Sequence, residues 1–402
     1  MKIVMIGPFG MRPRGTMSFR ALPLARALVI RGHEVTLLLP PWQNPEDAAQ
    51  SWEDAGVWIE NLPLPAGVPG WFHWRLTVTL ARRALALQPD IIHVFKPKAY
   101  AGLSHWLLAY HPLMQPPSRH IPIVVDTDDW EGPGGWNDLN PYPTPLKRFF
   151  TWQEQWGFKH ANVITVASRA LETLAWATGT PPERVFYLPN GIAWPYPPVK
   201  PVPHTRPTLL LYTRFFEYKL ERLWHIVQGV RVHYPDLRLW VVGKGFFNEE
   251  LALLRLARES NWHVAETMPP PEGADLIYAG LVKPEERPMH FAQADIALYP
   301  FDDTLINRTK CPVKLLDLLA AGIPVVGDRV GQITESIQQG ETGLLVPPGD
   351  TAAFTEAVLM LLKDANRRHT MSKRSATDVR ARLSWDTLAA TAEAAYYNAR
   401  IA

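Results

Sequence analysis

The stretch MKIVMIGPFG (residues 1–10) is a short apolar run that ends in a glycine turn, a pattern that predicts a buried strand. A loop with two glycines and two arginines follows, and residues 18–31 then place apolar side chains on one face of a helix. Gly32 ends that helix, and EVTLLL (34–39) is a second apolar run. Strand, glycine loop, helix and strand in succession predict a parallel sheet with helices on both faces.

The same alternation continues on both sides of a proline-rich segment. Residues 193–207, AWPYPPVKPVPHTRP, contain six prolines, which neither continue a helix nor pair inside a sheet, so we expect a stiff linker. We therefore expect two tandem Rossmann-like α/β domains facing a cleft, residues 1–192 and 208–380, and a final helix within 381–402. The predicted strands are 90–95, 121–126, 162–166, 208–212, 237–242, 276–279, 296–300 and 323–327, and the later helices are 221–233, 249–259, 312–321, 351–363 and 385–400.

Composition excludes several classes of protein. The 41 Lys and Arg residues nearly balance the 39 Asp and Glu residues, which leaves a net charge of +2 and no basic excess of the kind that nucleic-acid binders carry. The single cysteine, Cys311, excludes an internal disulfide and a multi-cysteine metal site. The longest uncharged run, residues 99–118, contains three prolines and is a poor membrane span. We expect a cytoplasmic protein.

Two segments of the second half could bind an anion. In TRFFEYKLE (213–221), Arg214 and Lys219 lie just beyond a strand and could clamp a diphosphate, although a solvated charged loop has the same pattern. In KCPVKLLDLLAAGIPVVG (310–327), a helix starting at Pro312 and Val313 would present free backbone N–H groups. Residues of this second segment could assist: Lys310 and Lys314 flank the helix end, and Asp317 could accept hydrogen bonds from sugar or ribose hydroxyls. A capped helix with one solvated Asp remains the alternative.

Two acidic groups are further candidates. Glu335, in GQITE (331–335), could accept hydrogen bonds from hydroxyls or simply be a surface residue. In DTDDW (126–130), Asp126, Asp128 and Asp129 could form a base or a metal site, or a turn in which the carboxylates are solvated. The chain contains no G-x-G-x-x-G fingerprint, P-loop, nucleophile elbow or H-E-x-x-H pair, which argues against the classes that these motifs mark.

Nine short strings stand in an order that resembles one known family. Each string alone is weak evidence, but their order and spacing together are specific. They are RGHEVTLLLP (31–40), PDIIHVF (89–95), LPNGI (188–192), TRFFEYK (213–219), WVVGKG (240–245), LVKPEE (281–286), ADIALYP (294–300), LLAAGIPVV (318–326) and GETGLLVPPGD (340–350). This order resembles glycosyltransferase family 4, retaining enzymes with the GT-B fold that use nucleotide sugars.

The resemblance implies a role for individual residues. Arg214 and Lys219 match the pair that binds the donor diphosphate, and Asp317 matches the second acid of the E-x7-E motif, which holds the ribose. Glu335 matches the acid after the family's paired glycines. Gly243 belongs to the I-V-G-x-G strand end.

The resemblance also implies what the first domain and the final helix do. Gly15 and Thr16 match the glycine loop near the phosphates and the acceptor, so the acceptor is expected mostly on the first domain. The final helix is expected to cross back onto that domain. No cofactor and no required metal are implied.

Some positions depart from the family pattern. Thr309 stands where the first acid of E-x7-E is expected, and the paired acid is Asp rather than Glu. NRTKCPVK (307–314) instead resembles a family subset in which Lys310 or Lys314 adds phosphate binding. A His-Asp pair often present in the first domain is replaced by DTDDW, so Asp128 or Asp129 could take its acceptor-side role, and the sequence does not choose between them. Ala193 replaces an acid that often follows PNG.

The implied activity is a hexosyltransferase that moves a sugar from a nucleoside-diphosphate sugar to a sugar, lipid-linked or small-molecule acceptor in polysaccharide or glycoconjugate synthesis. A non-hydrolysing nucleotide-sugar epimerase and a catalytically degenerate binding subunit are the alternatives. Peripheral membrane contact is also open. WFHWRLTVTLARRAL (71–85) mixes Trp, Phe and Arg and could lie on an anionic membrane, but its narrow polar face favours a helix packed in the core.

Overall fold

A computed structural model describes the chain from Met1 to Ile401, except Arg14, Val68, residues 111–120 and Ala193. The predictions for Ala193 and for the end of the uncharged run, residues 111–118, lie outside the described residues. The chain divides into two compact units. The first comprises Met1–Gly191, Thr309–Cys311 and Leu383–Ala402, and the second comprises Ile192–Arg308 and Pro312–Arg382.

The first unit is built on one twisted sheet. In the described part of this unit the sheet has eight strands in the order β3-β4-β2-β1-β5-β6-β7-β8. All neighbours pair in parallel except β3 and β4, which form an antiparallel edge. The strands are β1 (Lys2–Ile6), β2 (Glu34–Leu39), β3 (Ser51–Asp54), β4 (Val57–Asn61), β5 (Ile91–Phe95), β6 (Ile123–Thr127), β7 (Val163–Val166) and β8 (Val185–Tyr187).

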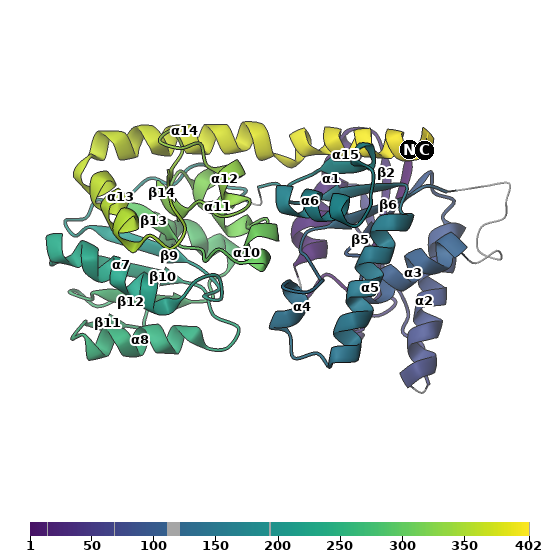
Figure 1. Cartoon of the computed structure of the whole chain (residues 1–402), viewed down its shortest axis with the longest axis horizontal. Coiled ribbons are helices and arrows are strands. Elements are labelled where there is room, and N and C mark those ends of the chain that lie inside the picture. Colours follow the sequence, from purple (N-terminus) through teal and green to yellow (C-terminus); the bar gives the residue numbers. More distant parts are fainter. Residues whose placement is uncertain (14, 68, 111–120, 193, 402) are drawn as a thin grey trace. The chain divides into compact units, whose positions relative to one another are not determined.

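Helices cover this sheet, and the last helix of the chain is one of them. The helices are a π-helical turn (Met17–Ala21), α1 (Leu22–Ile30), α2 (Pro69–Ala86), α3 (Ala99–Tyr110), α4 (Trp136–Leu139), α5 (Thr144–His160), α6 (Arg169–Ala177) and α15 (Trp385–Ile401). Figure 1 shows α15 beside α1. The buried Tyr396 hydroxyl lies 2.8 Å from Nδ1 of His93 in β5, and Glu393 pairs with His33 at 2.8 Å. The return of the final helix to the first domain is therefore confirmed.

The second unit repeats the architecture with a fully parallel sheet. Among its described residues the strand order is β11-β12-β10-β9-β13-β14-β15. The strands are β9 (Thr208–Tyr212), β10 (Arg238–Val242), β11 (Val264–Ala265), β12 (Leu276–Gly280), β13 (Ile296–Tyr299), β14 (Val325–Asp328) and β15 (Leu344–Val346). The helices are α7 (Leu220–His233), α8 (Glu249–Glu259), α9 (Arg287–Phe291), α10 (Leu305–Thr309), α11 (Val313–Ala321), α12 (Ile333–Ser336), α13 (Thr351–Lys363) and α14 (Ala365–Leu383). The predicted fold class, two parallel-sheet α/β domains with a returning helix, is confirmed.

The central strands of each sheet are buried because they are apolar on both faces. Every residue of β5 and of β9 is buried, and each sheet lies in its own hydrophobic core. Polar groups at the carboxyl ends of such strands cannot enter these cores, so they gather at the sheet edge where ligands bind in open α/β folds. No helix of the described residues combines the length and the apolar character that crossing a membrane requires.

The proline-rich segment packs along the second unit. The Val199 amide donates to the Ala321 carbonyl at 2.9 Å, and the Val202 amide donates to the Ala292 carbonyl at 2.8 Å. The Trp194 ring stacks on Phe291 with a centroid distance of 5.1 Å. The described residues of this segment are therefore held by backbone hydrogen bonds and an aromatic contact.

Candidate functional site

Four side chains of the second unit converge where β9 ends and α11 begins. Nζ of Lys314 lies 3.6 Å from the centre of the Tyr212 ring, and the Arg287 guanidinium lies 5.9 Å from the same ring. Nη1 of Arg287 is 3.1 Å from Oδ2 of Asp317. Lys314 and Asp317 share one face of α11 because they are three residues apart. We call Tyr212, Arg287, Lys314 and Asp317 the α11 cluster.

Asp317 is almost fully buried, at 1% exposure. Burial raises its pKa to about 6, although Arg287 and Lys314 oppose the rise. The Tyr212 hydroxyl also interacts with this carboxylate and opposes the rise. The second oxygen, Oδ1, makes no hydrogen bond of normal geometry to any described residue. A buried carboxylate oxygen without a partner is costly, so this atom is suited to accept a hydrogen bond from a ligand hydroxyl.

Lys314 has an unusually low pKa for a lysine. Burial lowers the pKa of Lys314 to about 7, and the positive charge of Arg214 adds to that effect. Arg214 is exposed, and its guanidinium lies 5.1 Å from the Phe246 ring. Two neighbouring cations that repel each other in the free protein are a favourable site for a multiply charged anion.

The amino end of α11 adds backbone donors to these cations. Pro312 occupies the N-cap position, and no side chain of the described residues caps the helix. The amides of Val313 and Lys314 therefore stand at a helix end whose dipole attracts negative charge. A helix end beside Arg214 and Lys314 can bind a phosphate group.

A close approach of two loops depends on Gly243. Its φ is +128°, and a Cβ there would lie 1.9 Å from the Thr213 carbonyl oxygen. No other residue type fits this contact, so Gly243 lets the loop after β10 come up to the loop that carries Arg214. The structure thus gives Gly243 a role in backbone packing, while its predicted role in donor binding stays a prediction.

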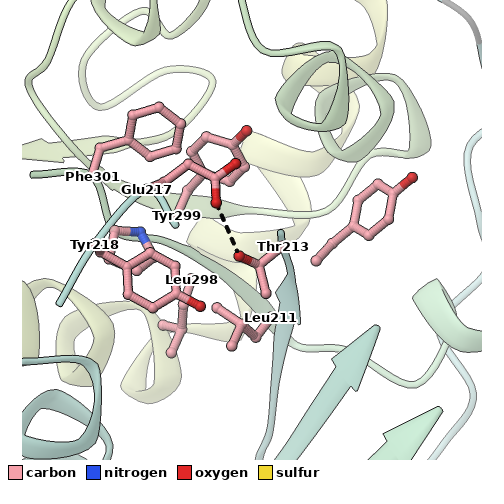
Figure 2. A pocket seen from close by; sticks show the side chains of 9 residues that line it. Leu211, Thr213, Glu217, Tyr218, Leu298, Tyr299 and Phe301 are labelled. Carbon is pink, nitrogen blue, oxygen red and sulfur yellow. Dashed lines mark hydrogen bonds between the residues drawn. The ribbon is translucent and has the colours of Figure 1, made fainter. Parts of the chain in front are cut away.

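A small pocket borders the α11 cluster at Tyr212 (Figure 2). Its space, open solvent included, is about 190 Å³, which is below the range of typical small-molecule sites. Thr213 faces Glu217 across it, with 3.5 Å between the hydroxyl and Oε2. The pocket is too small for a nucleotide. The lining residues are Leu211, Tyr212, Thr213, Glu217, Tyr218, Leu298, Tyr299, Pro300 and Phe301.

Three predicted residues lie outside the direct contacts of the α11 cluster among the described residues. Lys219 is exposed at the N-cap position of α7. Glu335 is exposed on α12, where its carbonyl accepts a hydrogen bond from Arg382. Lys310 belongs, with Thr309 and Cys311, to the first unit.

In the first unit, the glycine loop and the DTDDW segment meet. The Thr16 hydroxyl donates to Oδ2 of Asp128 at 3.0 Å. Nζ of Lys96 lies 2.7 Å from Asp129 and 3.5 Å from Asp128. Gly15 lies directly before this contact, and a Cβ on it would come within 2.7 Å of the Phe19 ring. The loop and both carboxylates therefore form one cluster at the carboxyl ends of β1, β5 and β6.

The charged groups of this cluster shift one another's pKa values. Burial raises the pKa of Asp129 to about 6, with Asp128 and Glu131 adding to the rise and Lys96 opposing it. Burial disfavours the Lys96 cation, but the three carboxylates outweigh that effect and raise the pKa of Lys96. Lys96 therefore stays charged, and Asp129 changes protonation close to neutral pH, as a group that handles protons must.

Asp126 does not join its two neighbours. It forms a two-pronged ion pair with Arg20 at 2.7 and 2.6 Å, and both side chains are buried. Arg20 also donates to the Asn190 side chain at 3.0 Å. The aspartates of DTDDW thus face different cations: Asp126 faces Arg20, and Asp128 and Asp129 face Lys96. In the described part of the chain, no cluster of three or more side chains could hold a metal ion.

Sequence reasoning missed several partners. Lys96 and Lys98 follow β5 directly in the string KPK, so the strand-end rule that selected DTDDW could have selected them. Arg20 lies on an apolar helix face, where a cation predicts a buried partner. Arg287 carried no signal, since nothing local indicates that it reaches Asp317, 30 residues away.

Comparisons with known proteins agree with this architecture. Residues 15–191 match the model of the glycosyl transferase 4-like domain, and residues 206–364 match that of glycosyl transferases group 1. A GDP-mannose-dependent alpha-(1-6)-phosphatidylinositol monomannoside mannosyltransferase of Mycobacterium tuberculosis is 26% identical over 96% of each chain.

Solved structures show the same fold. Sucrose-phosphate synthase of Thermosynechococcus elongatus superposes with a TM-score of 0.70 at 17% identity over 98% of each chain. Anabaena HepE, solved with UDP, superposes with a TM-score of 0.64 at 15% identity over 98% of this chain and 99% of that one. From the family matches, the relatives and the fold together, the chain belongs to the group 1 glycosyltransferases and has the GT-B fold.

Proposed function

We propose that the protein transfers a hexose from a nucleoside-diphosphate sugar to an acceptor hydroxyl with retention of configuration. The observation that carries the donor assignment is the α11 cluster: a buried carboxylate with an unpartnered oxygen beside Lys314, Arg214 and an uncapped helix end. These groups complement the two ends of a nucleoside diphosphate, hydroxyls at the ribose and negative charge at the phosphates.

The chemistry follows from the charge that develops. When the bond between the sugar and the β-phosphate breaks, the sugar becomes cation-like and the nucleoside diphosphate gains negative charge. Arg214, Lys219, Lys314 and the α11 amides are proposed to stabilise that charge, which lowers the barrier. In this mechanism the leaving phosphate accepts the proton of the incoming hydroxyl on the same face of the sugar, which gives retention. No enzyme nucleophile and no metal ion are required.

The acceptor is assigned to the first unit. Asp128 and Asp129 offer carboxylate oxygens beside Thr16 that can hold an acceptor through hydrogen bonds to its hydroxyls. Names of relatives suggest which compounds to test. The mycobacterial relative is named for GDP-mannose and a lipid acceptor, and HepE was solved with UDP. GDP-mannose and UDP-glucose are therefore the first donors, and glycolipids are among the first acceptors.

Thermal unfolding with GDP, UDP and ADP, each with and without magnesium, tests the donor site. A ligand that binds only the folded protein stabilises it by about 2.7 kcal/mol at one hundred times its dissociation constant. We expect one base to raise the unfolding temperature without magnesium. No shift with any base at millimolar concentration would contradict the donor assignment and favour a binding subunit.

Product analysis separates transfer from epimerisation. The matching nucleotide sugar is incubated with and without an acceptor, and the products are resolved by NMR. A transferase forms an α- or β-linked product only with acceptor, and the anomeric configuration of that product tests retention. Conversion of the donor to its epimer without acceptor would support the epimerase instead.

A further inference from the structure

Three helices on one side of the first unit expose aromatic side chains. α3 lies between α2 and α5 and contacts both: the Tyr100 hydroxyl is 2.6 Å from Nδ1 of His73 in α2, and the Gln153 amide of α5 exchanges two hydrogen bonds with the Ala99 backbone. Figure 1 shows the three helices grouped together. The apolar half of each helix supplies the core, including Leu76 and Leu80 of α2. Their outer half carries the exposed rings, and we call it the α2–α3–α5 face.

Aromatic rings form a continuous row along α5. Phe149 stacks on Trp152 with a centroid distance of 5.8 Å, Trp152 lies 6.3 Å from Trp156, and Trp156 stacks on His160 at 4.4 Å. Tyr110, at the end of α3, joins the row 5.5 Å from Trp156. At the rise of an α-helix, this row is about 16 Å long.

Much of this aromatic surface is exposed. Trp152 is 44% exposed, and Tyr110 is 54% exposed. On α2, Trp71 and Trp74 are 60% and 41% exposed. Single exposed aromatics are ordinary, but a row of them on adjoining helices is characteristic of an interaction surface.

The charge of the face is one-sided. The whole chain is nearly neutral, yet the only acidic residue in α2, α3 and α5 is Glu154, and it is fully buried. Exposed cations stand on the same helices, Arg75 and Arg82 on α2 and Arg148 and Lys159 on α5. The complementary partner is therefore negatively charged and offers an apolar layer for the rings.

We propose that the α2–α3–α5 face docks the protein on an anionic lipid bilayer. Trp and Tyr rings favour the boundary between head groups and acyl chains, and Lys and Arg near the surface are attracted to anionic head groups. The binding is peripheral and depends on salt. The proposal concerns where the enzyme binds in the cell and does not depend on which donor the enzyme uses.

Co-sedimentation with vesicles tests the proposal. The full chain is mixed with vesicles of phosphatidylcholine alone or with about 30% phosphatidylglycerol, in low and high salt. We expect binding to the anionic vesicles in low salt and release in high salt. Arg148→Glu with Lys159→Glu should weaken binding by about 30-fold or more, the effect of losing two cations near an anionic surface. Phe149→Ser with Trp152→Ala should weaken it about tenfold and leave a weak, salt-sensitive remainder.

Matched variants guard against general effects. Arg255→Glu with Lys363→Glu reverses two exposed cations of the second unit, and Trp176→Ala removes an exposed tryptophan of α6; both should bind vesicles like the unchanged protein. Equal binding by the charge-reversal pair on α5, or no binding by the unchanged protein, would overturn the proposal. A second result would also overturn it: the unchanged protein is a dimer that does not bind vesicles, and the variant Phe149→Ser with Trp152→Ala is a monomer. The face would then join two copies of the chain. The nucleotide-induced thermal shift is measured on every variant, so that a failure of the donor assignment is recognised separately.

Discussion

Nζ of Lys314 lies 3.6 Å from the centre of the Tyr212 ring, on the side of α11 that also carries Asp317. The ring covers the amine and removes water from it, while its electron-rich face attracts the charged form. Burial and the nearby Arg214 dominate, and the pKa of Lys314 falls to about 7. The amine is thus half-charged near neutral pH until an anion arrives, so binding and protonation are coupled at this residue.

Nucleotide binding is predicted to take up a proton between about pH 7 and pH 9. The bound diphosphate favours the charged amine and raises the pKa of Lys314, so affinity falls as pH rises above 7, by at most about tenfold per pH unit for one linked proton. Groups that face the amine and also contribute are Arg214, Arg287, Asp317 and Glu217. Calorimetry in two buffers of different ionisation enthalpy measures the uptake, and Lys314→Met should abolish it. Equal uptake in the variant would contradict the assignment.

Without ligand, the same lowered pKa has the opposite consequence for stability. The unfolded chain binds a proton at Lys314 more readily than the folded one, so this group destabilises the fold below pH 7, and the penalty is relieved as pH rises from about 7 towards 10. Lys314→Met should therefore stabilise the ligand-free protein most at pH 6. Denaturant unfolding at pH 6 and pH 9 measures the difference.

Arg214→Ala is predicted to reduce turnover by about 100- to 1000-fold, the effect of removing one preorganised group that stabilises developing negative charge. The side chain is exposed, so the unfolding temperature should change little. Arg255→Ala, at an exposed position of α8, is the control and should retain full turnover. Initial rates with the donor found by thermal shift test this, and near-normal turnover of Arg214→Ala would remove Arg214 from the mechanism.

Gly243→Ala is predicted to destabilise the second unit by about 3 kcal/mol or more. The new Cβ meets the Thr213 carbonyl at 1.9 Å, and φ of +128° is itself strained for alanine. Gly340→Ala separates the two effects, since φ there is +80° with nothing within 4 Å, and it should cost only about 1 kcal/mol. Chemical denaturation compares the two variants. An equal loss of unfolding free energy in the two variants would show that the close approach of the loops does not contribute to the cost.

Lys96→Met is predicted to destabilise the first unit by about 3–5 kcal/mol at pH 7, because it leaves buried carboxylates without their cation. Asp129 already binds its proton more tightly in the folded state, so its contribution to stability is present below about pH 4 and lost as pH rises through about 6. The variant should therefore recover part of its stability at pH 5. Lys147→Met, which removes a partner of the exposed Asp138, is the control and should change little at either pH.

Elements with strong local signals were predictable from the sequence. The strands 34–39 and 208–212 and the helices 249–259 and 351–363 have the predicted bounds. For the helix 351–363 the reason is local, because the Asp350 side chain caps its start by accepting a hydrogen bond from the Ala353 amide. The short edge strand β3 and its neighbour β4 escaped prediction. The helix α14 escaped it too, because its apolar positions are few and widely spaced.

The sequence by itself determined which strand ends carry chemistry, because polar residues directly after apolar runs must lie at the carboxyl edge of a parallel sheet. It thereby selected Arg214, Asp128 and Asp129, whereas Asp317 was selected from the helix predicted to start at Pro312. Only the tertiary structure decided their partners and their charge. Asp317 meets Arg287 across 30 residues, and Asp129 meets Lys96 across 33. Their pKa values depend on burial and on charges supplied by other elements, which no local pattern encodes.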